Sequence, residues 1–300
     1  MSVTTPKGFT AAGVTAGIKA SGRPDLALVV NNGPDAHAAA VFTSNAFKAA
    51  PVVWSADAVA DGRLTAVVLN SGGANACTGR AGLEDARQMA AWTSASLGCD
   101  ATDVAVCSTG LIGVRLPMNK VLAGIELATQ DLSDEGGPAA AEAIMTTDTV
   151  AKQAEYQSAH RWAIGGMAKG AGMLAPALAT MLVVITTDAV LPADALAPAL
   201  TTATGFTFDR TDSDGCMSTN DTVILLASGA SGVEADPEEF TEALTGVCHS
   251  LARQLLADAE GSAHDIEVTV SGAATDDDAL AVARAIARSN LFKCAVFGND

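Results

Sequence analysis

Short β-prone runs alternate with helical patterns along this chain of 300 residues. The β-prone runs are residues 26–30, 39–43, 65–70, 104–108, 180–187, 222–227 and 266–271. The helical patterns, rich in Ala, Leu, Glu and Arg, cover residues 82–97, 118–127, 138–144, 237–257 and 276–288. Strands that alternate with helices pack as layers of sheet and helix, so we predict a layered α/β fold.

Composition and charge exclude several classes of protein. The net charge of -17 argues against nucleic acid or an anionic membrane as a partner, because like charges repel. No apolar run reaches the ~18 residues that a membrane-spanning helix needs, and the N-terminus lacks the pattern of a signal peptide. Six scattered cysteines without a C-x-x-C pair and four isolated histidines favour reduced thiols without a metal centre. We therefore expect a cytoplasmic protein.

A loop of small residues ends at Pro176 and runs into a β-prone segment that begins at Thr180. If the Ala179–Thr180 bond were cut, Thr180 would carry both a hydroxyl and a free α-amine. An α-amine has a pKa near ~8 and can serve as the base that activates the neighbouring hydroxyl. The alternative is an ordinary connector that leads into a buried strand.

Two glycine-containing turns follow predicted strands. After residues 104–108, the hydroxyl of Thr109 and the N–H of Gly110 can form a two-donor hole for an oxyanion, although a simple turn is the default interpretation of these residues. The loop 70–79 can line a pocket or bind phosphate, or it can be purely structural.

Two acidic segments have possible roles in fixing loops or binding a cation. The polar stretch 209–221 lacks the complete spacing of a calcium loop, which favours hydrogen bonding that fixes loops. Asp258 and Glu260 lie at the end of a predicted helix, where a carboxylate is unfavourable with respect to the helix dipole. Such a carboxylate is either solvated or held to meet an ammonium group.

Taken in order, these motifs resemble the ornithine acetyltransferase family of arginine biosynthesis. The resemblance extends over residues 8–300. The motifs that carry it are S-T-G-L-I-G at 108–113, T-T-D at 146–148, K-G-A-G-M at 169–173, A-T-M-L at 179–182, S-T-N-D at 218–221 and E-G at 260–261.

The resemblance implies an αββα-like sandwich of the N-terminal-nucleophile type. It also implies that the precursor cleaves itself between Ala179 and Thr180, which divides it into an α chain (1–179) and a β chain (180–300) that assemble as α2β2. Thr180 would then accept acetyl from N2-acetylornithine and pass it to glutamate. No bound cofactor is expected, and acetyl-CoA is a possible co-substrate.

The resemblance also implies roles for particular residues. Thr109 and Gly110 match oxyanion-hole positions, and Thr146, Lys169, Thr180 and Glu260 match substrate-binding positions. These roles suit the side chains, because a lysine can bind an α-carboxylate and Glu260 can bind the δ-ammonium of ornithine.

The chain departs from the family in two respects. His264 stands where a more strongly basic residue is common, and a C-terminal segment that carries further Asn and Ser substrate positions is absent. We therefore expect incomplete activity from these residues alone. Two other functions stay open: an aminopeptidase or amidase with the same nucleophile, and a truncated remnant without catalysis.

Overall fold

The computed structural model describes residues 2–173 and 181–300, which form nine strands and eight α-helices. The strands are β1 (Phe9–Val14), β2 (Leu26–Asn31), β3 (His37–Phe42), β4 (Ala66–Gly73), β5 (Val104–Leu111), β6 (Lys152–Gln157), β7 (Ala163–Lys169), β8 (Leu182–Thr187) and β9 (Thr222–Ala227). The helices are α1 (Ala50–Ala58), α2 (Gly79–Leu97), α3 (Met118–Gln130), α4 (Gly137–Ala143), α5 (Ala193–Phe206), α6 (Pro237–Ala257), α7 (Asp276–Ala287) and α8 (Asn290–Phe297).

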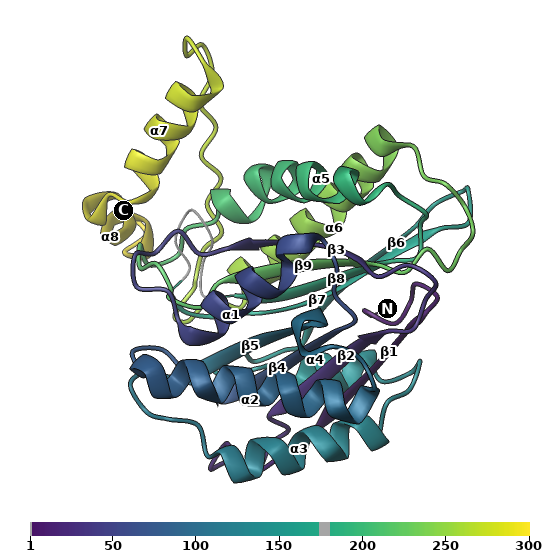
Figure 1. The fold of residues 1–300 in the computed structure, drawn as a ribbon. Coiled ribbons are helices and arrows are strands. Elements are labelled where there is room, and N and C mark those ends of the chain that lie inside the picture. Colours follow the sequence, from purple (N-terminus) through teal and green to yellow (C-terminus); the bar gives the residue numbers. More distant parts are fainter. Residues whose placement is uncertain (1, 174–180) are drawn as a thin grey trace.

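The strands form two mixed sheets that face each other. One sheet has the order β1-β2-β4-β5 and the other β3-β9-β8-β7-β6. Only the β4–β5 and β8–β9 pairs are parallel among these strands. Helices α2 and α3 cover the outer face of the first sheet, and α5 and α6 cover the outer face of the second (Figure 1). The predicted αββα sandwich is therefore confirmed.

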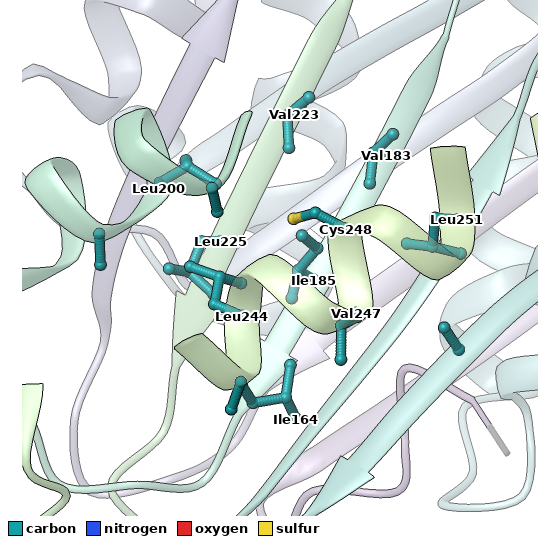
Figure 2. Close-up of a cluster of buried hydrophobic side chains, with 14 of the residues drawn as sticks. Ile164, Val183, Ile185, Leu200, Val223, Leu225, Leu244, Val247, Cys248 and Leu251 are labelled. Atoms are coloured by element: carbon teal, nitrogen blue, oxygen red, sulfur yellow. The ribbon is translucent and has the colours of Figure 1, made fainter. Parts of the chain in front are cut away.

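Strand β8 illustrates how the layers are held together. Its alternate residues Leu182 and Val184 belong to the core between the two sheets, whereas Val183 and Ile185 belong to the core beneath α5 and α6. Figure 2 shows the latter pair together with Leu244 of α6. Successive side chains of a strand point to opposite faces, so a strand buried on both faces must be apolar throughout.

Most of the predicted elements are confirmed. The helix predicted at residues 237–257 coincides with α6, whose N-cap Asp236 accepts hydrogen bonds from the main-chain N–H groups of Glu238 and Glu239. Strands β1, β6 and β7 and helices α1, α5 and α8 were not predicted. Pro198 inside α5 and the glycine pair Gly165-Gly166 in β7 weaken the local signals of those two elements.

The strand predicted at residues 266–271 is wrong. Its alternating Ile, Val and Thr residues are typical of a strand, but the segment pairs with no other strand among the described residues. Ile266 is 47% exposed, and α7 and α8, which follow, contain no buried residue. Alternation alone does not make a strand, because the backbone needs a hydrogen-bonding partner.

Candidate active site

The ends of four strands from both sheets meet at one place. Strand β7 ends at Lys169, which pairs with Leu182 at the start of β8, and Leu182 in turn pairs with Thr222 at the start of β9. The Nζ of Lys169 donates a hydrogen bond of 3.3 Å to the hydroxyl oxygen of Thr109 in β5. This contact joins the two sheets and is buried, since Lys169 is 2% and Thr109 is 3% exposed.

Asn220 fixes the relative position of the two sheets at this place. Its side-chain amide donates to the carbonyl oxygens of Ala74 (2.6 Å) and Ser108 (2.9 Å), which lie after β4 and within β5. The side-chain oxygen of Asn220 accepts from the hydroxyl of Thr219 at 2.7 Å. The loop-fixing role predicted for the polar stretch 209–221 is thus confirmed, although the sequence did not indicate that Asn220 bridges the sheets.

Gly110 has a backbone that only glycine adopts readily. Its φ is +126°, and it lies where the pairing of β4 and β5 is irregular. A Cβ added to Gly110 would lie 2.5 Å from the carbonyl carbon of Gly72. The two strands therefore approach each other closely beside Thr109, which fixes the position of the predicted oxyanion donors.

Substitution Gly110→Ala is expected to displace this strand end. We expect a loss of roughly 3 kcal/mol or more, from backbone strain of about 1–3 kcal/mol together with a clash of similar cost. If Gly110 belongs to the catalytic machinery as the resemblance implies, the turnover rate is expected to fall about 10²-fold, because a displacement of about 1 Å in a catalytic group has that effect. Gly113→Ala is the control, since Gly113 also has a positive φ (+82°) but no atom within 4 Å of an added Cβ. Equal effects on urea midpoint and turnover rate in the two variants would contradict this prediction.

Lys169 is the first member of a row of side chains with alternating charge. The Asp148 carboxylate lies 3.9 Å from the Lys169 Nζ and accepts a hydrogen bond of 2.7 Å from Lys152. Lys152 also donates to Asp258 at 2.6 Å, and Asp258 accepts from the main-chain N–H and the hydroxyl of Thr149. The carboxylate at the end of α6 therefore does meet an ammonium group, but the ammonium belongs to Lys152.

The environment shifts the pKa values of these groups. Burial lowers the pKa of the Lys169 ammonium, and the charge of Asp148 acts in the opposite direction. Burial by itself would raise the pKa of Asp148, but the charge of Lys169 and the hydrogen bond from Lys152 lower it to about 2. Asp148 is therefore ionised at neutral pH.

Two further predicted substrate-binding residues, Thr146 and Glu260, contact residues in or next to this row. Thr146 donates its main-chain N–H to Asp148 at 2.9 Å. The main-chain N–H of Glu260 donates to the carbonyl oxygen of Ala171 at 2.6 Å, and its exposed carboxylate lies over Gly172. The structure thus brings Thr146, Lys169 and Glu260 into one region, with Glu260 at its rim.

A cleft of about 690 Å³ extends from Glu260 along the outside of the molecule. His264 lines it, together with residues of α7. Among the described residues with a predicted role, Glu260 lines the cleft, whereas Thr109 and Lys169 do not.

Ala179 and Thr180 lie outside the described residues. The next residue along the chain, Met181, donates its main-chain N–H to the Asp221 carboxyl at 3.1 Å, and its carbonyl oxygen accepts from the N–H of Thr222 at 3.1 Å. The main chain immediately after the predicted nucleophile is therefore held between β7 and β9, beside Lys169.

Three other features concern metal ligands, membrane-spanning helices and cysteines. Within residues 2–173 and 181–300, no group of three or more His, Cys, Asp and Glu side chains is placed to hold a metal ion. No helix in the same ranges has the length and apolar character to cross a membrane. All six cysteines are free; Cys107 and Cys248 are buried, and Cys77, Cys216 and Cys294 are exposed.

Comparisons with known proteins point to one family. Residues 10–300 match the sequence profile of the ArgJ family. The arginine biosynthesis bifunctional protein ArgJ of Streptomyces coelicolor is 62% identical over 300 residues, which are all of this chain and 78% of the relative.

Two solved structures are also similar. One is ornithine acetyltransferase from Mycobacterium tuberculosis, solved with ornithine, which has 55% identity and a TM-score of 0.58 over 60% of this chain and 96% of that one. The other is the arginine biosynthesis bifunctional protein ArgJ from Bacillus halodurans, with 40% identity and a TM-score of 0.54 over 61% and 95% of the two chains.

Proposed function

Because this chain belongs to the ArgJ family, we propose that it transfers the acetyl group of N2-acetylornithine to glutamate through an acetyl-enzyme on Thr180. The products are ornithine and N-acetylglutamate. The observation that carries the proposal is the match to the family profile over residues 10–300, which includes every residue given a catalytic or substrate-binding role.

The nucleophile is made by self-cleavage between Ala179 and Thr180. The Thr180 hydroxyl attacks the Ala179 carbonyl carbon, the C–N bond breaks, and water then hydrolyses the ester to free both chains. Two observations support this step. Met181 is firmly anchored next to Thr180. The matched solved chain from M. tuberculosis corresponds to 60% of this chain, about the share that 1–179 represents.

Transfer then occurs in two balanced half-reactions. The Thr180 Oγ attacks the acetyl carbonyl carbon while its α-amine takes the hydroxyl proton; the amide C–N bond breaks, and the proton passes to the departing amine of ornithine. The neutral α-amine of glutamate next attacks the acetyl ester. The C–O bond breaks, and Thr180 regains its proton.

Thr109 and Gly110 stabilise the oxyanion in both half-reactions. The hydrogen bond from Lys169 to the Thr109 hydroxyl oxygen supports this role, because a hydroxyl that accepts from an ammonium directs its own proton elsewhere. A preorganised donor of this kind is worth about 10²–10³ in rate in other enzymes.

Lys169 and Thr146 bind the α-carboxylate of the substrate, and Glu260 binds the δ-ammonium of ornithine. Supporting this arrangement, the Lys169 ammonium lies beside Thr109, and the charge of the exposed Glu260 opposes the lowering of the Lys169 pKa that burial causes. A zwitterionic amino acid fits this separation of charges better than a neutral amide does.

Three further features belong to the same proposal. Acetyl-CoA serves as a second acetyl donor, since the relatives carry the description bifunctional. The α and β chains assemble as α2β2. The enzyme works in the cytoplasm, and its six free cysteines support a reducing compartment.

Intact-mass measurement of the purified protein tests the cleavage. We expect two polypeptides whose masses match residues 1–179 and 180–300, and incubation with N2-acetylornithine should add one acetyl group to the second. An acyl-acceptor assay then separates transfer from hydrolysis. Production of N-acetylglutamate supports the transferase, whereas release of acetate at the same rate with and without glutamate would refute it.

A further inference from the structure

Asp221 is a buried acidic residue that the proposed chemistry does not use. It is 0% exposed, and one carboxyl oxygen, Oδ1, accepts the main-chain N–H of Met181. Its other oxygen, Oδ2, is buried and makes no hydrogen bond of normal geometry to the described residues. A carboxylate in such a place would leave a charge largely uncompensated.

The electrostatics of the surroundings favour the neutral acid. Burial raises the pKa of Asp221 well above the ordinary carboxyl range, against weaker opposing effects from the Met181 N–H and the hydroxyls of Ser218 and Thr43. Lys169 is a charged side chain that acts on Asp221, and the ion pair that Lys169 makes within the described residues is with Asp148. The Lys169 ammonium instead contacts Thr109.

We propose that Asp221 works as a neutral carboxylic acid that positions Met181, and through one peptide bond the nucleophile Thr180. This inference rests on the proposed function. Met181 is held at three points: its N–H by Asp221, its carbonyl oxygen by Thr222, and its side chain, 1% exposed, by the core under α5 and α6. Of these three contacts, the hydrogen bond to Asp221 holds the main-chain nitrogen of Met181, which is the atom bonded to Thr180.

Neutrality of Asp221 has a consequence for Lys169. An ionised Asp221 would compete with Asp148 and Thr109 for the ammonium of Lys169, because opposite charges attract strongly in a buried site. A protonated Asp221 still accepts the N–H of Met181 through its carbonyl oxygen but does not draw Lys169 away. One residue therefore holds the main chain without disturbing the cation that binds substrate.

The pair Asp221→Asn and Asp221→Leu tests this role. Asn keeps a neutral carbonyl oxygen that accepts from Met181, so cleavage and kcat are expected to stay within about 3-fold of the unmodified enzyme. Leu removes the acceptor and is expected to slow cleavage and lower kcat, measured per cleaved molecule, at least 10-fold with little change in KM. If the Asn and Leu variants are equally impaired, an ionised carboxylate is needed and the proposal is overturned. If the Leu variant keeps the wild-type kcat, catalysis does not need Asp221 to position Met181, and the proposal is overturned as well.

Asp188 offers a matched control just beyond the other end of β8. It is also buried (3% exposed), and it accepts main-chain N–H bonds from Ala163 and Lys7. Asp188→Leu is expected to lower stability without lowering the kcat of the folded fraction. If kcat falls equally in the Asp188 and Asp221 Leu variants, the effect is one of general stability and the proposal fails.

The pH dependence of stability is a second readout, and it serves even if Asp221→Leu does not fold. Because its pKa is raised in the folded state, Asp221 releases its proton on unfolding, so its contribution to stability is full below about pH 4 and is lost as the pH rises toward the folded pKa. Relative to the Asp221→Asn variant, the folding equilibrium constant of the protein with Asp221 should fall up to tenfold per pH unit between about pH 4 and the folded pKa of Asp221. Both proteins carry Thr180→Ala, so that each unfolds as one chain. A difference that does not change between pH 4 and 8 would overturn the proposal.

Failure of this inference differs from failure of the proposed function. If Thr180→Ala alone transfers acetyl normally, the function itself is wrong. If Thr180→Ala is inactive while Asp221→Leu keeps full kcat, only the role of Asp221 is wrong.

Discussion

Thr180→Ala is expected to leave the protein as one uncut polypeptide and to abolish acetyl transfer. The substitution removes the hydroxyl that attacks the Ala179 carbonyl, so neither the cut nor the free α-amine can form. Loss of a catalytic nucleophile costs at least about 10³-fold in rate, because the acyl-enzyme route is closed. Denaturing electrophoresis and a glutamate acetylation assay measure the two effects on the same sample.

Two controls make this experiment specific. Thr180→Ser keeps a hydroxyl and is expected to cleave and to retain measurable transfer. Thr201→Ala removes an exposed hydroxyl on α5 that donates to the carbonyl oxygen of Ala197 in the same helix, and it is expected to change neither property. Wild-type transfer by an uncut Thr180→Ala protein would refute the N-terminal nucleophile.

Lys152→Met is expected to destabilise the protein by about 3–5 kcal/mol, the usual cost of breaking a buried ion pair by removing one partner. Lys152 has a side-chain exposure of 0%, and its ammonium bonds both Asp148 (0% exposed) and Asp258 (7% exposed). Without it, two carboxylates would lie close together and would lose the ammonium that both contact. Urea unfolding in the Thr180→Ala background measures the free energy on a single chain.

An exposed ion pair provides the comparison for Lys152. Arg87 and Glu84 on α2 lie 3.8 Å apart with side chains 55% and 74% exposed, so Arg87→Met is expected to change stability by less than about 1 kcal/mol. Adding Asp258→Asn to Lys152→Met should recover part of the loss, because one uncompensated charge is then removed. A loss for Lys152→Met no greater than that for Arg87→Met would show that the row of charges does not stabilise the fold.

The elements that could be predicted from the sequence are those with complete local signals. Helix α6 has an acidic N-cap, Pro237 at its start and a long helical pattern, and its predicted bounds match the structure. Strand β9 is apolar after its first residue, Thr222, and was also predicted in full. Segment 266–271 has the local pattern of a strand but pairs with no other strand among the described residues. Its prediction failed because strand pairing depends on distant parts of the chain, which a local pattern does not contain.

The candidate site divides in the same way. Its motifs could be located from the sequence, and the family resemblance assigned roles to Thr109, Lys169 and Glu260 that stay proposals. Asn220 and Asp221 were recognised as part of a polar stretch and of the S-T-N-D motif, without a role for either residue. Their separate tasks, bridging two sheets and holding Met181, depend on which main-chain groups lie within hydrogen-bonding distance after folding.

The sequence by itself determined the elements with complete local signals and the family, and it predicts the position of the cut, because these depend on neighbouring residues and on motif identity. Only the tertiary structure decided which charges are buried together. Lys152 and Asp258 are 106 positions apart and meet at 2.6 Å. Desolvation and Coulomb energy depend on that distance and on burial, and neither quantity exists until the layers have packed.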